Sequence, residues 1–268
     1  MTSRSSHAAT SRSGVRVASQ SLEAGRGDRR HRAPIGIAGS ALCLLLASSP
    51  ASPSRAAQAP DPPAPTAAEP DGGGGDPAAA LRAVERIERQ STGIRTLSAS
   101  LVQEKHLALF EKPLVLEGRL YLQKPDRVAF RIERPLRYTM VISGEQLRQW
   151  DEDSGEVQTI SLADNPGFKL VLRQMRGWLS GSYSSMLGEY HATVLREEPI
   201  ELVFVPREHA LAYGTVERVR VAFGPDARHL REIEILDRQG DRTLFRFADV
   251  RLDPDLDPAV WEAEPRGR

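Results

Sequence analysis

The chain has 268 residues, of which 36 are basic and 36 acidic, so its formal net charge at neutral pH is zero. A balanced chain has no global field that would attract nucleic acid, and we expect no nucleic-acid partner. The single cysteine, Cys43, lies inside an apolar N-terminal run, so the sequence excludes a disulfide framework and leaves the rest of the chain without a thiol nucleophile.

The N-terminal region has the order of a secretory signal. A basic stretch, "RGDRRHR", precedes the apolar run "APIGIAGSALCLLLASS", and small residues ending in "SRAAQ" follow it. A membrane-spanning helix needs roughly twenty apolar residues, more than this run offers. We therefore predict that residues 1–57 are a leader and signal peptide, cleaved between Ala51 and Ala59, with an uncleaved anchor as the alternative. Leu42 stands where a lipid-attachment signal needs a small residue, so we expect no lipid on Cys43.

A tether separates the signal from the folded part. Residues 58–76 are rich in proline, then in glycine, which predicts a flexible linker. The remaining segment, 77–268, has roughly 190 residues, enough for one domain with a sizeable core.

The folded part begins with a helix and continues with strands. "DPAAALRAVERIERQSTG" opens on Asp-Pro and ends on Gly93, and its apolar stripe is expected to include Leu81, Val84 and Ile87. From Thr96 the apolar period changes to two. Six short strands are predicted, in "TLSASLVQEKHLAL", "LVLEGRLYLQ", "RVAFRIE", "LRYTMVIS", "EQLRQWDED" and "EVQTISL".

The second half repeats this pattern after a helical insert. "NPGFKLVLRQMRGWLSGSYSSMLGEY" has helical spacing, and its glycines predict two short helices. About five strands follow, and a last one is expected in "AVWEAEP". The predicted fold class is α+β: a strongly curved antiparallel sheet, or incomplete β-barrel, with about three helices lidding its concave face.

The sequence offers no visible catalytic or metal-binding constellation. The predicted folded part has four histidines, His106, His191, His209 and His229, which are scattered singly, and none forms the i, i+4 pair of a helical zinc site. "GSYSSMLG" lacks the Gly-x-Ser-x-Gly elbow, and "DEDSGE" lacks the later ligands of a calcium loop. We expect no enzyme activity, no metal and no cofactor.

A large apolar face remains to be explained. Period-two spacing places one group of side chains on the same face of adjacent strands, and helical spacing adds a second group from the insert. The predicted pocket residues are Leu101, Leu120, Leu122, Val128, Phe130, Ile132, Met140, Phe168, Val171, Met175 and Trp178. The alternative is that these side chains form an ordinary core.

Several stretches, in this order, resemble the LolA family of outer-membrane lipoprotein carrier proteins. They are "LSASLVQ" with Gln103, "EGRLYLQKPDRVAFRIERP", "VISGEQLRQWDEDSGEVQTISL", "LVFVPREHA" and "LREIEILDRQGDRTLFRFADVRLDPDLDPAVWEAEPRG". The likeness extends from Leu81 to Gly267. No single stretch is specific, but their common order makes chance similarity improbable.

The resemblance implies a monomeric carrier in the periplasm. Such a carrier takes acylated lipoproteins from an inner-membrane ABC exporter, shields their acyl chains in its pocket and passes them to an outer-membrane acceptor lipoprotein. Lys124 stands at the pocket rim, where the family usually has arginine, and this departure puts any role of a planar guanidinium in doubt. The alternatives are a carrier of another lipid working with a different exporter, and a periplasmic lipid-sensing regulator.

Overall fold

The computed structural model describes residues 76–108, 110–164 and 166–264, without the side chains of 166–171. The predicted leader and the linker up to residue 75 lie outside the described residues, as do the last four residues of the predicted domain. Phe168 and Val171 belong to a described helix, but their side chains lie outside the described part.

The described strands form a single antiparallel sheet. Its eleven strands have the order β6-β5-β4-β3-β2-β1-β11-β10-β9-β8-β7. The first and last strands pair along most of their length, so only one long connection, from β6 to β7, joins strands that are not neighbours. The strands are β1 (Thr96–His106), β2 (Leu114–Gln123), β3 (Arg127–Arg134), β4 (Tyr138–Ser143), β5 (Gln146–Asp151), β6 (Val157–Ser161), β7 (Tyr190–Glu197), β8 (Ile200–Pro206), β9 (Val216–Phe223), β10 (Leu230–Asp237) and β11 (Arg242–Leu252).

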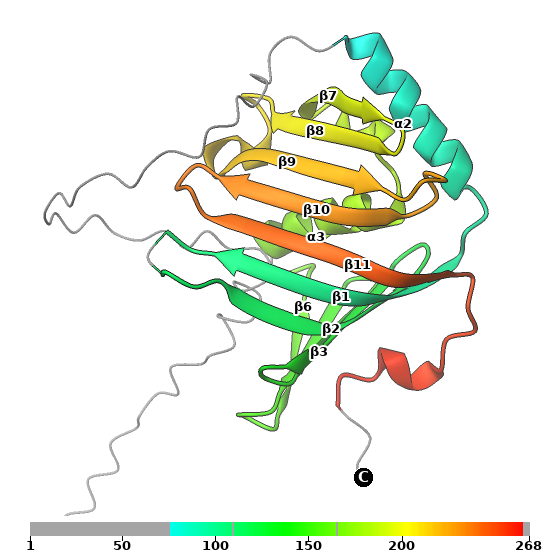
Figure 1. Cartoon of the computed structure of the whole chain (residues 1–268). Coiled ribbons are helices and arrows are strands. Elements are labelled where there is room, and N and C mark those ends of the chain that lie inside the picture. Colours follow the sequence, from blue (N-terminus) through cyan, green and yellow to red (C-terminus); the bar gives the residue numbers. More distant parts are fainter. Residues whose placement is uncertain (1–75, 109, 165, 265–268) are drawn as a thin grey trace, which may run out of the picture. The chain divides into compact units, whose positions relative to one another are not determined.

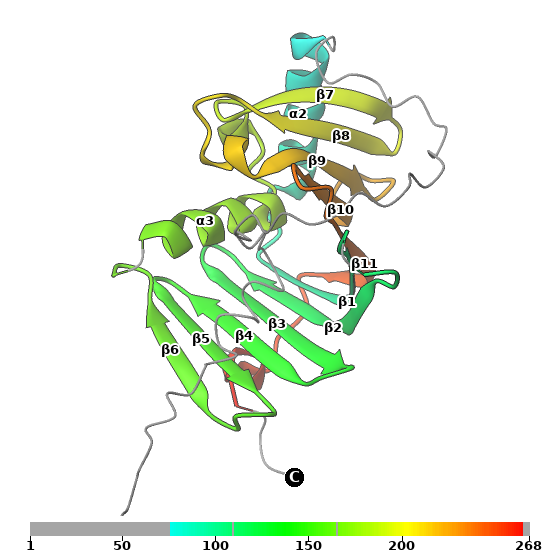
Figure 2. The ribbon, with the colours of Figure 1, turned by 90° about the vertical axis from the view of Figure 1, so that its left-hand side faces the viewer.

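The sheet bends strongly but does not close. Strands β6 and β7 are its two edges, and they do not pair with each other. Figure 2 shows the two ends of the sheet as separate arms, β3–β6 and β7–β9, with the helix α3 (Pro166–Ser180) lying between them. The expected curved antiparallel sheet is confirmed. Because α3 is part of the β6–β7 connection, the chain topology itself delivers a helix to the concave side.

Two α-helices, rather than the predicted three, accompany the sheet in the described residues: α2 (Pro77–Ser91) and α3. The insert is one helix followed by a 3-10 turn, η1 (Ser184–Met186). Gly177 does not interrupt α3, because its missing Cβ makes room for Met186, whose Cε would lie 2.7 Å from such an atom. The helix ends before Gly181, which has a φ of 84°.

The expected last strand is also wrong. Pro258–Trp261 forms a 3-10 turn, η3, because Asp257 caps its start by accepting a hydrogen bond of 2.8 Å from the Ala259 amide. The guanidinium of Arg131 holds this turn to the outer face of β3, donating to the carbonyls of Ala259 and Glu262 at 2.6 Å each. Partial burial lowers the pKa of Arg131.

Helix α2 (Figure 1) begins where the Asp-Pro signal predicts. The Asp76 carboxylate accepts from the Ala78 amide at 2.9 Å, which satisfies one free donor of the first turn. Its buried face, however, contains Ala80, Val84, Ile87 and Ser91, whereas Leu81 is 44% exposed. Val84 and Ile87 are therefore buried as predicted, but the buried face includes Ala80 in place of Leu81. Helix α2 packs against β7.

Alternation along the strands separates an inner, concave face from an outer one. The inner side chains merge with α2 and α3 into one hydrophobic core. Gly118 lies on this inner face next to a β-bulge, where a Cβ would lie 2.0 Å from the Arg131 carbonyl oxygen. Only glycine therefore permits this approach of β2 to β3.

Candidate functional site

Two cavities lie between the inner face and the helices. The larger, about 160 Å³, is called here the apolar cavity, and the smaller, about 40 Å³, the cationic cavity. Leu179 of α3 and Phe247 of β11 line both, so the two cavities share a wall. Together they form the candidate site.

The apolar cavity is built mainly from the last strands and α3. Its floor is an aliphatic and aromatic surface of β9, β10 and β11, and its roof is α3. The 3-10 turn η2 (Leu211–Gly214) closes one side of the cavity. The lining is Phe130, Gln174, Met175, Trp178, Leu179, Tyr190, Leu211, Ala212, Thr215, Val216, Val219, Ile233, Ile235, Phe245 and Phe247. With so few polar groups, this cavity suits an apolar ligand.

Two polar contacts fasten α3 to opposite arms of the sheet. Gln174 donates a hydrogen bond to the Tyr190 hydroxyl of β7, and Arg176 donates to the Gly144 carbonyl at 2.9 Å, in the turn between β4 and β5. One contact is on each arm, so α3 bridges the concave face. Moving α3 away from the sheet would require both contacts to break.

An aromatic cluster anchors the end of α3. The ring of Trp178 meets that of Phe204 edge-on, with centroids 4.9 Å apart, and Tyr183 donates a hydrogen bond of 2.6 Å to the Trp178 carbonyl. Burial raises the pKa of Tyr183 well above its ordinary value. Burial, with a smaller effect from Glu189, raises the pKa of Tyr190 to about 12. Both hydroxyls therefore stay neutral at physiological pH.

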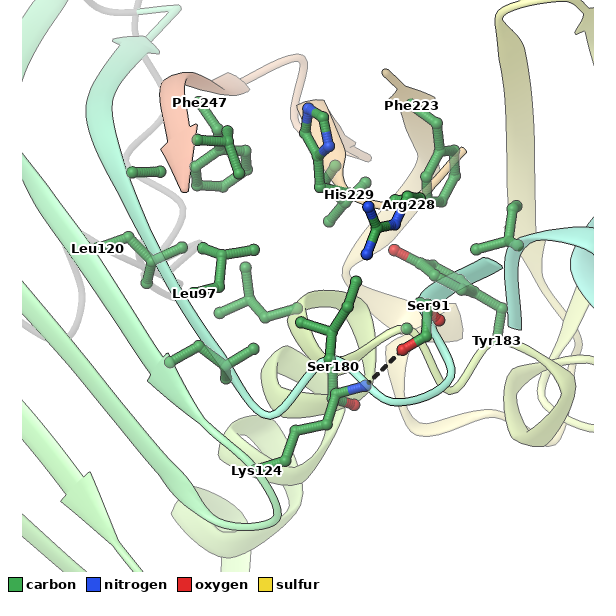
Figure 3. A pocket seen from close by; sticks show the side chains of 18 residues that line it. Ser91, Leu97, Leu120, Lys124, Ser180, Tyr183, Phe223, Arg228, His229 and Phe247 are labelled. Atoms are coloured by element: carbon green, nitrogen blue, oxygen red, sulfur yellow. Dashed lines mark hydrogen bonds between the residues drawn. The ribbon is translucent and has the colours of Figure 1, made fainter. Parts of the chain in front are cut away.

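The cationic cavity opens beside the C-terminal ends of both helices, as Figure 3 shows. Leu97, Leu120 and Phe247 form its apolar side, and Lys124 and Arg228 reach it from two different hairpin turns. Lys124 Nζ donates to the Ser91 carbonyl at 3.5 Å, near the limit of a hydrogen bond. Burial lowers the pKa of Lys124, while Asp253 acts in the opposite direction.

The predicted pocket residues fall into three groups. Leu120 and Leu122 line the cationic cavity, together with Lys124, which is half-buried. Phe130, Met175 and Trp178 line the apolar cavity. The rest of the described set is buried in the same core but lines neither cavity: Leu101, Val128, Ile132 and Met140.

Sequence reasoning missed the contribution of the last strands and their turns. Phe245 and Phe247 alternate in "TLFRFADV", so period two places them on one face. Nothing local indicates that β11 pairs with β1, which places Phe245 opposite Gln103 and Phe247 opposite Leu101. Arg228 lies in a turn that the sequence predicts only as a hairpin connection.

The outer face of the same strands is charged and internally paired. Arg220 of β9 lies 2.7 Å from Glu201 and 3.2 Å from Glu232, measured from guanidinium nitrogen to carboxylate oxygen. Such pairs continue across neighbouring strands, with signs that alternate. The outer ladder, as we call it, is Glu104, Arg246, Glu232, Arg220, Glu201 and Arg196.

Neither a metal centre nor a membrane-spanning helix is found in the described part of the chain. No group of three histidine, cysteine, aspartate or glutamate side chains there is arranged to hold a metal ion. Among the described helices, none has the length and apolar content needed to cross a membrane.

Comparison with known proteins gives a consistent result. The family described as "Outer membrane lipoprotein carrier protein LolA" matches residues 92–263. A protein of Alkalilimnicola ehrlichii named outer-membrane lipoprotein carrier protein is 27% identical over 182 residues, which cover 67% of this chain and 78% of its own. A protein of the same name from Chromohalobacter salexigens is 25% identical over 154 residues, covering 56% of this chain and 68% of its own.

Solved structures resemble the fold more distantly. The crystal structure of a LolA superfamily protein from Nitrosomonas europaea matches with 11% identity and a TM-score of 0.37, covering 68% of this chain and 97% of that one.

Proposed function

The chain belongs to the LolA family of outer-membrane lipoprotein carrier proteins, and from this premise we propose that it carries acylated lipoproteins across the periplasm. The acyl chains lie against the inner face of the sheet, beneath α3. The exporter at the inner membrane and the acceptor at the outer membrane are part of the same proposal, as are the monomeric state and the absence of catalysis.

The apolar cavity is the observation that carries the proposal. Each acyl methylene gains about 0.8 kcal/mol when it leaves water, so an anchor with several chains needs a continuous apolar shelter during transfer. A cavity of about 160 Å³ is close to the size of apolar cavities, about 150 Å³, that stay dry and accept benzene. The cavity supports the proposed shelter, but it is too small for several chains.

The contacts that hold α3 against the sheet explain why the cavity is smaller than the space that several acyl chains need. If α3 swings away from the sheet, the concave face between the arms becomes available to longer chains. The contacts that would break are Gln174 to Tyr190, Arg176 to Gly144 and the ring contact of Trp178 with Phe204. The two hydrogen bonds contribute about 1 kcal/mol each, and the aromatic pair contributes about 0.5 to 1.5 kcal/mol beyond its buried area. The acyl chain covers the apolar surface that α3 leaves, so its burial outweighs these losses and cargo can open the lid.

A defined cargo tests the proposal. The purified protein is mixed with a synthetic triacylated lipopeptide, and soluble complexes are separated by size-exclusion chromatography without detergent. We expect a complex of one lipopeptide per chain, and none with the same peptide lacking acyl groups. Val219→Phe, which fills the floor of the apolar cavity, should fold but retain little lipopeptide. Failure of the unaltered protein to retain the acylated peptide would contradict the proposal.

A further inference from the structure

The cationic cavity contains two positive side chains without a carboxylate partner. Within the described part of the chain, no carboxylate oxygen lies within 4 Å of Lys124 Nζ or the Arg228 guanidinium. Lys124 has only its long contact with the Ser91 carbonyl. Hydrogen bonds from the amides of Arg95 and Thr96 lower the pKa of the Asp253 carboxylate, and Arg228 adds a smaller effect in the same direction. This carboxylate in turn acts on Lys124 from beyond 4 Å.

This arrangement contrasts with the other face of the same sheet. In the outer ladder each arginine lies beside a glutamate, as Arg220 does beside Glu201 at 2.7 Å. Lys124 is half-buried, and an unpaired cation in such a position lowers stability unless something compensates for it. Arg228 is exposed and adds a second positive charge to the lining of the same cavity, so the two together indicate a position for an external anion.

The surroundings specify the size of that anion and the character of the group attached to it. Figure 3 shows Arg228 and Lys124 approaching the cavity from opposite sides, with their charged ends toward the space between them. The imidazole of His229 lies beside them, packed against Gly224, where a Cβ would be 2.7 Å from its ring. A space of about 40 Å³ admits only a compact group. The shared wall of Leu179 and Phe247 leads from it to the apolar cavity.

We propose that the cationic cavity binds the anionic head of an amphiphile, a carboxylate or a phosphate, whose acyl chain occupies the apolar cavity. Lys124 and Arg228 each donate charge-assisted hydrogen bonds to the anion, and the half-buried position of Lys124 strengthens its bond. The inference rests on the proposed function in one respect, namely that an acyl chain can enter the inner face. It adds a ligand class, single-chain anionic lipids, which the carriage of lipoproteins does not require.

Displacement of a neutral fluorescent probe, N-phenyl-1-naphthylamine, tests the proposal. Three ligands of equal chain length compete for the site: dodecanoate, dodecyl phosphate and the uncharged dodecanol. We expect at least one anion to bind about 10-fold more tightly than dodecanol, with an advantage that shrinks at high salt because the cations are partly exposed. The carboxylate and the phosphate distinguish a fatty acid from a phosphorylated lipid as the source of the head group.

Variants of the two cations test whether they cause the preference for an anion over dodecanol. Arg228→Gln should reduce the advantage of the anion several-fold and leave dodecanol binding unchanged. Combining it with Lys124→Gln should abolish the advantage. Arg231→Gln is the matched control, because Arg231 follows in the same hairpin and is exposed, but does not line the cavity. Arg228→Gln alone keeps the test valid if the change at Lys124 disturbs folding, which thermal unfolding by circular dichroism reports.

The outcomes separate this inference from the proposed function. Equal affinities for dodecanol and both anions would overturn the inference, as would an equal loss in Arg231→Gln and Arg228→Gln. If lipopeptide is retained while the anions show no advantage, only the anion subsite fails. If neither lipopeptide nor dodecanol binds, the proposed function itself fails.

Discussion

The inner and outer faces of strands β1 and β8–β11 share one backbone but differ in charge pairing and in packing. On the outer face, the ladder pairs each charge with one of opposite sign on the next strand, and Leu244 is only 1% exposed between Glu104 and Glu234. On the inner face, aliphatic and aromatic side chains leave two cavities unfilled, and Lys124 and Arg228 line the smaller one, with no carboxylate among the described residues within 4 Å of either charge.

The difference indicates that the protein loses part of its free energy of unfolding at the inner face. Paired charges on the outer face hold neighbouring strands in register, and their long stems cover apolar atoms. The cavities and the half-buried Lys124 on the inner face cost free energy that denser packing would recover. Features that destabilise an empty protein and suit a ligand are concentrated at the inner face, as a binding site requires.

The largest effect is expected from a charge on the inner face. Phe130 is 2% exposed and lines the apolar cavity. Phe130→Glu removes a large ring and buries a carboxylate without a partner, so we expect a loss of about 3 to 5 kcal/mol in the free energy of unfolding. Uptake of an acylated ligand should be abolished. Urea unfolding and probe displacement measure the two effects.

The control for this prediction adds the same charge to an exposed position. Gln146→Glu changes an exposed residue at the start of β5, and it should alter neither stability nor uptake by a measurable amount. A folded Phe130→Glu protein that binds acyl chains with unchanged affinity would remove Phe130 from the site.

Breaking the outer ladder should affect stability alone. Arg220→Met keeps the apolar stem but leaves Glu201, which is 8% exposed, with only Arg196 at 3.7 Å. We expect a loss of about 1 to 2 kcal/mol in the free energy of unfolding, since one partner of a largely buried pair is removed. Ligand affinity should be unchanged at a temperature where the variant is folded. A change in affinity comparable to that of an inner-face variant would show that the two faces are not independent.

A smaller effect is expected where the lid meets the sheet. Tyr190→Phe removes the acceptor of the Gln174 hydrogen bond, which should cost about 1 kcal/mol and speed probe uptake. Because the folded pKa of Tyr190 is raised from 10.0 to about 12, its contribution to stability is complete below pH 10 and is lost as the pH rises toward 12. Unfolding midpoints between pH 9 and 12 should therefore fall less in Tyr190→Phe than in the unaltered protein. Parallel curves for the two proteins would refute this assignment.

The smallest effect is expected at Lys124. Lys124→Ala should slow the transfer of ligand from loaded carrier to acceptor membranes by a few-fold, with little change in thermal stability, because half-exposed charges contribute below about 1 kcal/mol. Lys124→Arg should restore or exceed the original rate. Transfer is measured at low and high salt, and a normal rate for Lys124→Ala under both conditions would leave Lys124 as a turn residue only.

The alternation of apolar and polar residues along each strand predicts much of this architecture, because this alternation depends on local sequence alone. It places Leu120, Leu122 and Phe130 on the inner face and indicates two runs of hairpin-linked strands. It does not show that β1 joins β11, since that pairing links residues about 150 positions apart and depends on how the whole sheet curves. For the same reason, it groups Val128 and Met140 with the cavity and leaves out the two phenylalanines of β11.

The helices show a similar limit. Asp76 and Pro77 mark the start of α2 correctly because a cap acts within one turn. The glycines of the insert, Gly177 and Gly181, predict two short helices, yet the role of Gly177 in α3 depends on Met186 packing against it, a tertiary contact without a local signature. Likewise, the position of Arg228 at the cavity is set by the fold of the β9–β10 turn and by the helices that face it.

The central claim is that the inner face shelters acyl chains, and native mass spectrometry of the exported protein tests it most directly. The protein is purified from the periplasmic fraction without detergent, alongside Val219→Phe. Our account predicts that the unaltered chain retains an acylated lipopeptide or lipoprotein and that folded Val219→Phe retains little. Equal loading of the two proteins, or no acylated species on the unaltered chain when acylated lipoproteins are present, would contradict it.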